Sequence, residues 1–317
     1  MTTDIRAVLI TPDAPGRLTL GRAPRPTCDR NETLMRVRAL SFNRGELRRA
    51  QGAPAGGRIG WDVAGLVEQQ AADGSGPPAG ARVVGFIPDC NGWAELAAVP
   101  SSYLAEIPAG VSDESAAALP VAGLTALYGL ERGSRLLGQR VLVTGASGGV
   151  GTFAVQIARL MGATVIAQIR RPEHEKLLRK AGADEIVIDE TGETLAARGP
   201  YRMILDGVGG SVLARTAPKL STGGTAVVYG VTAQTSTELS LGPLLGSGNA
   251  SVQGFNLYHE ARSEPPSGGL ARLLSLVRAG ELDPFVSHTA PWTDIGEAAA
   301  AFLARKHPGK VVLTVDS

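Results

Sequence analysis

The chain has few of the residues that build metal centres and disulfide frameworks. Its 317 residues include two cysteines, Cys28 and Cys90, and four histidines, which show no ligand spacing. Structural zinc sites need four such side chains at characteristic intervals, so the sequence predicts no metal. Two cysteines make no disulfide framework, which is typical of a protein in a reducing cytoplasm.

Neither sign of charge is in excess, and long apolar runs are absent. The formal net charge is +1 at pH 7, so neither nucleic acid nor an anionic membrane is expected as a partner. The longest apolar run, Ala116–Leu130, is too short to span a bilayer and contains Pro120. Asp4 and Arg6 interrupt the place where a signal peptide would have its apolar core. The sequence therefore predicts a soluble, cytoplasmic protein.

What is abundant is typical of a loop-rich α/β protein with two domains: hydrophobic residues make up 44% of the chain, with 41 glycines and 20 prolines. The first third predicts a partly open β-barrel, because short strand-like runs alternate with Gly/Pro-rich turns. These runs lie at 5–10, 34–40, 63–68 and 82–87. Ser112 begins a helix with acidic residues in its first turn, and the apolar run that follows is expected to be helical and buried.

From residue 140, predicted strands and helices alternate, which indicates a doubly wound parallel sheet. The strands are expected at 141–144, 164–168, 185–188, 203–206, 225–229 and 251–255, and the helices at 150–161, 173–181 and 211–219. Two further helices, at 270–279 and 294–306, and a strand at 310–315 are expected to return to the first domain. The predicted domains are therefore 1–118 with 260–317, and 119–259.

The stretch Val141–Gly151 is the strongest local motif. An apolar strand precedes a glycine cluster, and apolar residues at helical spacing follow it. This geometry points backbone N–H groups and the positive end of a helix dipole at a pyrophosphate. Ala146-x-Gly148-x-x-Gly151 fits the dinucleotide fingerprint with alanine in its first place, where Gly148 admits the phosphates and Gly151 lets helix and strand pack closely. The flanking elements favour nucleotide binding over a structural turn.

The same glycines, read as Thr144-Gly145-x-x-x-Gly149-x-Gly151, also match the fingerprint of short-chain dehydrogenases. That family carries the motif at the start of the chain and needs a Tyr-x-x-x-Lys pair. None of the five tyrosines has lysine four positions later. We therefore reject this assignment.

Motifs in order along the whole chain resemble the medium-chain dehydrogenase/reductase superfamily, in its zinc-free quinone oxidoreductase-like branch. They lie at Ser41–Glu46, Gly60–Gly65, Gly80–Gly85, Gly92–Glu95, Ala118–Ala126, the glycine cluster, Asp206–Gly210 and Gly309–Leu313. The resemblance implies a GroES-like partly open β-barrel catalytic domain and a Rossmann domain. It also implies a homodimer that pairs the edge strands of the Rossmann sheets.

In zinc-dependent members of this superfamily, a Cys/His/Cys set binds the catalytic metal. Here the first ligand position falls near Ser41 to Asn43, and Trp61-Asp62 replaces the usual His-Glu pair. Alcohol oxidation is disfavoured without a Lewis acid. Hydride transfer to a quinone or an α,β-unsaturated carbonyl remains, because conjugation makes these acceptors electrophilic. Asp62 is expected to be a hydrogen-bonding loop residue in preference to a base.

The resemblance also implies a catalytic set, Asn43, Arg44, Glu46 and Trp61. Asn43 matches an asparagine near the nicotinamide. Related reductases often carry Asp and Tyr where Glu46 and Arg48 stand here, which leaves the proton donor open. Trp61 lines the cleft or belongs to the core, and Arg48 and Arg49 bind substrate or form a solvated face. For Lys310, in the closing motif, structural packing is the safer role.

Cofactor choice is expected at the end of the second Rossmann strand, where NAD enzymes place an acid for the ribose 2′-OH. Ile169 occupies that position, and Arg170 and Arg171 follow. Guanidinium groups suit a 2′-phosphate, so NADPH is predicted, with His174 as a third contact; the alternative is two solvated arginines. The complete predicted cofactor set is Thr125, Ala146, Ser147, Gly148, Gly149, Val150, Gly151, Arg170, Arg171, His174, Val208, Gly230, Phe255 and Leu257.

Three functions remain open from the sequence. The leading hypothesis is an NADPH-dependent reductase of quinones or α,β-unsaturated carbonyls that works without zinc on a small-molecule substrate. A second is a biosynthetic tailoring enzyme, an enoyl or imine reductase for one specialised substrate. A third is an NADPH-binding sensor or structural protein that does not turn over.

Overall fold

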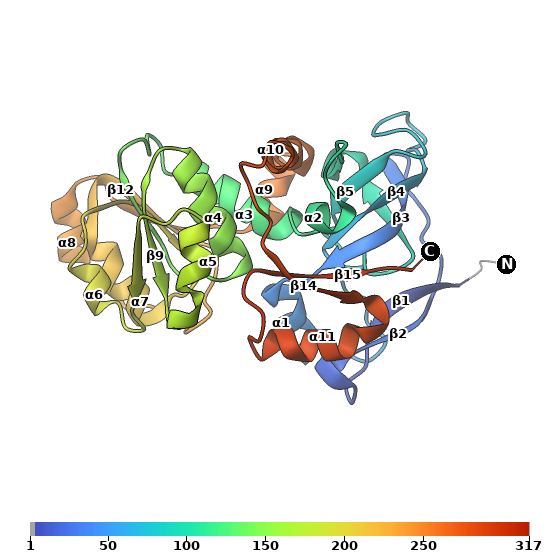
Figure 1. Ribbon diagram of the computed structural model, residues 1–317, viewed down its shortest axis with the longest axis horizontal. Helices are drawn as coiled ribbons and strands as arrows, with labels where there is room; N and C mark the ends of the chain where they lie inside the picture. The colour runs from blue at the N-terminus through green and yellow to red at the C-terminus, as the bar shows by residue number, and fades with distance from the viewer. Residues whose placement is uncertain (1–3, 317) are drawn as a thin grey trace. The chain divides into compact units, whose positions relative to one another are not determined.

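The computed structural model describes residues 4–316, and the chain forms two compact units. Unit 1 comprises the chain up to Leu124 together with the segment from Ala261 on, and unit 2 spans Thr125–Glu260. Figure 1 shows the strands and helices of both. No helix within residues 4–316 combines the length and the apolar character that crossing a bilayer requires.

Unit 1 is built on a sheet of seven strands, most of them antiparallel, with the order β14-β15-β3-β4-β5-β7 and β6 paired with β3. Its strands are β3 (Glu32–Ser41), β4 (Asp62–Gln69), β5 (Arg82–Phe86), β6 (Leu96–Pro100), β7 (Leu104–Glu106), β14 (Val286–Pro291) and β15 (Lys310–Thr314). A separate antiparallel pair joins β1 (Ile5–Ile10) to β2 (Leu18–Ala23). The helices are α1 (Arg44–Gly52), α2 (Asp113–Ala117), α10 (Pro266–Arg278) and α11 (Ile295–Leu303).

The C-terminal strand is part of the first sheet, since β15 pairs antiparallel with β3 and brings Val312 opposite Ser41. This pairing carries the start of β15 to the point where β3 ends and α1 begins. Phe42, at that junction, is 1% exposed, and its ring lies 5.2 Å from Trp93 and 5.8 Å from Phe302, measured between centroids. Burying such aromatic side chains stabilises the fold by roughly 1.5–3 kcal/mol each, which fixes the backbone next to Asn43.

Unit 2 is a six-stranded parallel sheet in the order β10-β9-β8-β11-β12-β13. The strands are β8 (Arg140–Val143), β9 (Thr164–Ile169), β10 (Glu185–Ile188), β11 (Tyr201–Asp206), β12 (Leu220–Val228) and β13 (Ser251–Gly254). The helices are α4 (Gly149–Leu160), α5 (Glu175–Lys180), α6 (Glu193–Ala196), α7 (Gly210–Thr216), α8 (Leu241–Ser247) and α9 (Leu257–Ser263), the last of which runs on into unit 1.

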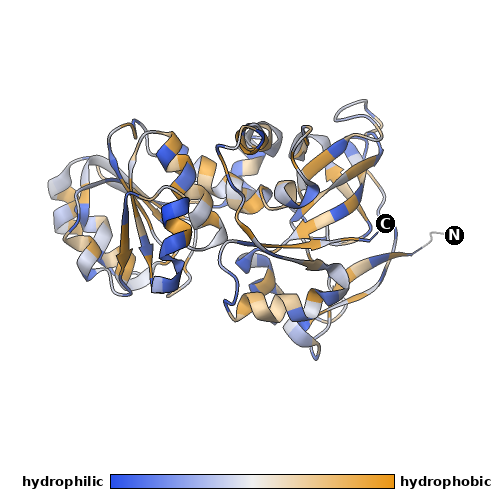
Figure 2. Ribbon diagram, viewed as in Figure 1, coloured by the Kyte–Doolittle hydropathy of each residue, from blue (hydrophilic) through white to orange (hydrophobic). Residues whose placement is uncertain are grey.

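The sheet order of unit 2 is the doubly wound order of dinucleotide-binding folds, with a switch point between β8 and β11. Figure 1 shows α4 and α5 on one side of the sheet and α6 and α7 on the other. The strands are strongly hydrophobic, whereas α5 presents charged residues (Figure 2), as expected for a sheet covered on both faces. The predicted fold class is therefore confirmed.

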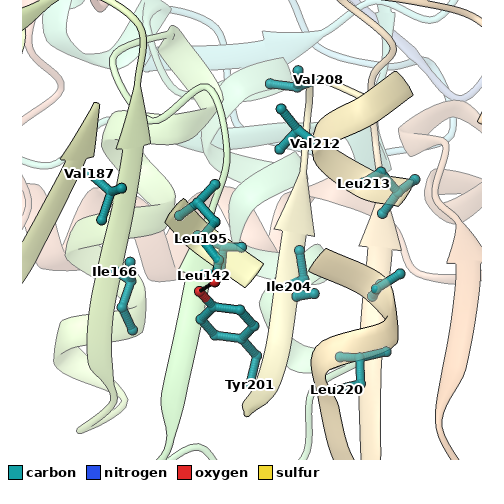
Figure 3. Packing of buried hydrophobic residues seen from close by; sticks show 12 residues of the cluster. Leu142, Ile166, Val187, Leu195, Tyr201, Ile204, Val208, Val212, Leu213 and Leu220 are labelled. Carbon is teal, nitrogen blue, oxygen red and sulfur yellow. Dashed lines mark hydrogen bonds between the residues drawn. The ribbon is translucent and has the colours of Figure 1, made fainter. Parts of the chain in front are cut away.

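One face of the sheet packs into the cluster shown in Figure 3, in which Tyr201 is the largest side chain. Its hydroxyl donates to the carbonyl of Leu195 at 2.6 Å, so this buried polar group is satisfied. Burial raises the pKa of Tyr201 to about 12. The phenol therefore stays neutral and structural.

The apolar run Ala116–Leu130, expected to be helical and buried, is helical but divided between two helices. α2 ends at Ala117, and α3 (Pro120–Glu131) begins at the proline. Proline has no N–H to donate to the preceding turn, so it ends the first helix and is well tolerated at the start of the second. Ser112 does cap α2, since its side chain accepts a hydrogen bond from the amide of Ser115.

Candidate functional site

The glycine cluster forms a turn between β8 and α4. Gly145 has a φ of +61°, a left-handed conformation that favours glycine. Gly148 precedes the helix with φ −82° and ψ 171°, and is exposed. Its extended backbone is one that any residue adopts. The predicted strand, turn and helix are all present here.

Gly151 and Gly148 have different surroundings. A Cβ on Gly151 would lie 2.5 Å from the Cα of Ala146, so helix and turn pack too closely for any side chain. A Cβ on Gly148 would meet only the carbonyl oxygen of Gly145, at 3.3 Å. Gly151 is therefore required by the fold, as expected from its place in the motif, while Gly148 leaves space beside the turn.

Several backbone N–H groups at the turn have no acceptor among the described residues. The first hydrogen bond of α4 runs from the amide of Thr152 to the carbonyl of Gly148 at 2.9 Å. Helix geometry leaves the preceding amides without an intrahelical partner, and those of Ser147, Gly149 and Val150 have none elsewhere within residues 4–316. Converging amides at the positive end of a helix dipole fit a pyrophosphate.

The end of β9 carries the predicted 2′-phosphate residues. Ile169, the residue aligned with the ribose position, is the last residue of β9 and is 1% exposed. Arg170 and Arg171 are both exposed. His174 is half-buried, and desolvation lowers its pKa.

At the switch point, a carboxylate that the sequence analysis did not single out joins β8 to β11. Thr144 donates its hydroxyl to Asp206 Oδ1 at 2.6 Å, and the amide of Gly209 donates to Oδ2 at 2.8 Å. Burial raises the pKa of Asp206, while these two donors pull it down. Val208, a predicted cofactor residue, is 7% exposed in the loop that follows.

A cavity of about 410 Å³ opens at the carboxyl ends of β12 and β13. Its walls are Arg132, Val228, Tyr229, Gly230, Val231, Gly254, Phe255, Asn256, His259 and Glu260. The structure thus brings the predicted residues Gly230 and Phe255 together, with the Arg132 guanidinium 5.3 Å from the ring centre of Phe255. Two further predicted residues of this unit, Leu257 and Thr125, are 5% and 6% exposed. Carboxyl ends of parallel strands are where dinucleotides bind.

In unit 1, the predicted catalytic residues Asn43 and Glu46 form a buried polar network. Glu46 is fully buried and Asn43 is 9% exposed. Glu46 accepts from the amide of Asn43 at 2.7 Å and from the amide of Trp61 at 2.9 Å. Burial, and then the Asp62 carboxylate, raise the pKa of Glu46 well above its ordinary value, although Lys310 and the two N–H groups act in the opposite direction.

Lys310 and Asp62 complete the network. The Lys310 ammonium donates to the Phe42 carbonyl at 2.8 Å, to Asn43 Oδ1 at 2.9 Å and to Asp62 Oδ2 at 3.2 Å. Asp62 also accepts from the hydroxyl of Ser41 at 2.8 Å and from the side chain of Asn43 at 2.7 Å. Asp62 is a hydrogen-bonding residue, as expected, but it begins strand β4 and does not lie in a loop.

The side-chain amide of Asn43 makes most of its possible hydrogen bonds inside this network. Its Nδ2 group donates to Asp62 and, at 3.1 Å, to Glu46, and its oxygen accepts from Lys310. An amide has two N–H donors, and both are engaged. The structure therefore places the side chains of Asn43 and Glu46 in a buried hydrogen-bonded network.

The remaining two predicted catalytic residues lie beside this core. The Trp61 ring is 8% exposed and packs against Gly45, where a Cβ would come within 3.1 Å of it. Arg44 is half-buried, with its guanidinium 5.9 Å from the ring centre of Phe302. Arg48 and Arg49 point to solvent.

The donor set at the positions of the superfamily's metal ligands does not fit zinc. The Trp61 side chain offers no ligand atom, and the Asp62 carboxylate is bound to the Lys310 ammonium. A divalent cation there would face a buried positive charge. Among residues 4–316, no three His, Cys, Asp or Glu side chains gather in a way that could hold a metal ion.

The chain is similar in sequence to several oxidoreductases. The family model described as zinc-binding dehydrogenase matches residues 149–274. A quinone oxidoreductase of Pseudomonas aeruginosa is 28% identical over 297 residues, covering 89% of this chain and 90% of that protein. The trans-enoyl reductase tazE of Aspergillus terreus is 32% identical over 210 residues, covering 59% of this chain and 69% of tazE.

Much longer proteins also match. The spectinabilin polyketide synthase system protein NorB of Streptomyces orinoci is 33% identical over 289 residues, or 88% of this chain, and the chain spans only 13% of its length. Among solved structures, mycobacterial Rv1454c in complex with NADPH superposes with a TM-score of 0.85 at 27% identity, covering 98% of this chain and 99% of that one. The chain belongs to the medium-chain dehydrogenase/reductase superfamily of nicotinamide-dependent oxidoreductases, in its quinone oxidoreductase-like branch.

Proposed function

We propose that the chain is an NADPH-dependent reductase that transfers hydride to a quinone or an α,β-unsaturated carbonyl without zinc. The observation that carries this proposal is the glycine turn. It presents three amides without partners among the described residues, and Arg170 and Arg171 follow the neighbouring strand. The similarity to a protein solved with NADPH supports the same cofactor.

The preference for NADPH follows from charge. No acid stands at the end of β9 to accept the ribose 2′-OH, and two exposed guanidinium groups lie there instead. Charge-assisted hydrogen bonds to a phosphate are worth roughly 1.5–3 kcal/mol each when well formed and less where solvent screens them. We infer that His174, in the short turn that follows, adds a weaker contact.

Replacing both arginines with alanine tests this assignment. NADPH binding should weaken by about one to three decades, while NADH binding changes little, because only NADPH carries the 2′-phosphate. Lys176→Ala with Lys180→Ala removes the same charge from the adjacent helix α5 and serves as the control. Equal weakening of both cofactors in the arginine variant would show that the 2′-phosphate binds elsewhere.

The chemical class of the hydride acceptor is inferred from the side chains that stand in unit 1 at the positions of the superfamily's metal ligands. Trp61, Asp62 and Lys310 offer no Lewis acid to polarise an alkoxide, so a conjugated acceptor that is already electrophilic suits the site. Elemental analysis of protein purified without chelator should find well under one zinc per chain. Stopped-flow oxidation of bound NADPH by a panel of quinones and enones should show turnover, and no turnover across the panel would favour a sensor or structural protein.

A biosynthetic enoyl reductase is the second candidate. Its support is the similarity to the trans-enoyl reductase tazE and to a polyketide synthase system protein. Adding enoyl thioesters to the same panel separates the two candidate functions. A tailoring enzyme should have a higher kcat/KM for one elaborate enoyl substrate than for simple quinones.

We also propose a cytoplasmic homodimer. Neither Cys28 nor Cys90 is in a disulfide, which suits a reducing compartment. Strand β13 pairs only with β12 among the described strands, and Leu241 and Leu245 of α8 are 64% and 82% exposed. An unpaired edge beside exposed leucines is a surface that a second copy could cover. Light scattering should give twice the mass of one chain, and a monomer would refute the dimer.

A further inference from the structure

Gln168 links the glycine turn to the two neighbouring strands. This residue is 1% exposed near the end of β9. Its side-chain oxygen accepts from the amide of Gly145 at 2.8 Å, and its main-chain oxygen accepts from the amide of Ala146 at 3.0 Å. On its other side, Nε2 donates to the carbonyl of Asp189, after β10, at 2.5 Å.

A neutral carboxamide is suited to this position. One end must accept from a backbone N–H and the other must donate to a backbone carbonyl, and glutamine supplies both groups on one side chain. A glutamate would bring a carboxylate oxygen against the Asp189 carbonyl, and an apolar residue would leave the Gly145 amide buried without an acceptor. Such unsatisfied groups are costly in a buried site.

These bonds decide which amides of the turn remain available. The N–H groups of Gly145 and Ala146 point to Gln168, and that of Gly148 donates to the Gly145 carbonyl at 3.0 Å. The Gly145 backbone, held in its left-handed conformation, thus sets the direction of the residues that follow. The amides of Ser147, Gly149 and Val150 are left for a ligand.

We propose that Gln168 is a positioning residue that holds the glycine turn in the shape that binds the pyrophosphate of the dinucleotide. The proposal rests on the proposed cofactor site and adds a residue that does not itself touch the cofactor. Because the pyrophosphate is common to both dinucleotides, loss of Gln168 should weaken NADPH and NADH alike. The arginine pair, by contrast, should affect NADPH alone.

Gln168→Met and Gln168→Glu test the proposal by titration of each variant with NADPH and with NADH. Methionine removes both hydrogen bonds at similar volume, and each dinucleotide should bind about tenfold or more weakly. Glutamate keeps the acceptor for Gly145 but adds a negative charge near the phosphates, so it should bind at least as weakly. KM for NADPH should rise, while kcat at saturating NADPH stays within about twofold of the wild type.

Gln156→Met is the matched control. Gln156 is also a buried glutamine, 7% exposed, and donates to the Thr152 carbonyl within α4 at 3.0 Å. This variant should leave both dissociation constants within about twofold, because its bond does not reach the turn. If Gln168→Met does not fold, Gln168→Glu, which keeps one of the two bonds, still gives the comparison.

The outcomes separate this proposal from the proposed function. Unchanged binding of both dinucleotides by the folded Gln168 variants, or a loss confined to NADPH, would overturn the positioning role alone. A wild-type chain that binds neither dinucleotide would overturn the cofactor site itself. Equal losses for both cofactors, with Gln156→Met unaffected, are the result that we expect.

Discussion

The glycine turn of unit 2 and the Lys310 network of unit 1 differ in whether their polar groups have hydrogen-bond partners. The turn leaves the amides of Ser147, Gly149 and Val150 without acceptors among the described residues, and Gly148 is exposed. In the network, the Lys310 ammonium has three acceptors and the Asp62 carboxylate is fully buried. Hydrogen-bonding groups without partners at a surface are available to a ligand, whereas hydrogen-bonded groups in a core stabilise the fold.

This contrast changes how the predicted catalytic residues are understood. Asn43 was expected near the nicotinamide and Glu46 was placed in the catalytic set, and the side chains of both are engaged in the network. Their contribution is to hold the start of α1 and the Trp61 backbone in place. The proposed cofactor site, by contrast, lies at the turn, where amides have no acceptor among the described residues. The variants below test both halves of this comparison, beginning with the largest expected effect.

Lys310→Met should lower the free energy of unfolding by about 3–5 kcal/mol, because it leaves the Asp62 carboxylate buried without its cation. Chemical denaturation measures the loss. Adding Asp62→Asn to this variant should recover part of it by removing the unpaired charge. Lys306→Met, at an exposed lysine, is the control and should change stability by no more than about 0.5 kcal/mol. Equal effects at the two lysines would contradict a stabilising network.

Glu46→Gln should cost about 1–3 kcal/mol, because a carboxylate can accept all of the N–H groups that point at it and a carboxamide cannot. The NH₂ group of the new side chain would face either the Asn43 amide or the Trp61 amide. Urea denaturation against Glu193→Gln, whose side chain is 73% exposed, isolates the effect of burial. If Glu46→Gln left the free energy of unfolding unchanged, the acceptor oxygens that Glu46 provides at the start of α1 would not be needed for stability.

The smallest effect is expected at the sheet edge, where His288 and His307 stack with ring centres 4.4 Å apart. Desolvation, the facing His288 and the neighbouring Lys306 lower the pKa of His307. Since the unfolded chain binds this proton more readily, the contribution of His307 to stability is full above pH 6.5 and declines as the pH falls below it. Denaturation at pH 7 and pH 5 should show a slightly smaller difference for His307→Gln than for the wild type. An unchanged difference would mean that this pair does not sense pH.

Sequence patterns predicted the turn well because its determinants are local. Strand, glycines and helix follow each other between Val141 and Gly162, so the period of apolar residues and the glycine spacing suffice. The Lys310 network escaped prediction because its members are distant in sequence, with Lys310 and Asp62 248 positions apart. They come together because β15 and β4 both pair with β3, on opposite sides of it. The one signal in the sequence was a polar residue at the start of two apolar strands, Asp62 in β4 and Lys310 in β15.

The role of Gln168 could be predicted from the sequence only in part. It lies 23 residues from Gly145 and reaches it because β9 pairs with β8 in parallel register. The sequence predicted both strands but not which side chain would face the turn, since alternation depends on where the strand ends.

The central claim is that the glycine turn binds the dinucleotide, and Gly148→Val tests it most directly. Valine fits the extended backbone at this position, and its Cβ meets only the Gly145 carbonyl, so the variant should fold with little loss of stability. Thermal melts of both proteins are compared with and without NADPH. The wild type should gain about 2.7 kcal/mol at a ligand concentration of 100 Kd, and the variant should gain nothing because the side chain occupies the space for the phosphates. A variant that keeps the full NADPH-induced shift would contradict the assignment of this turn.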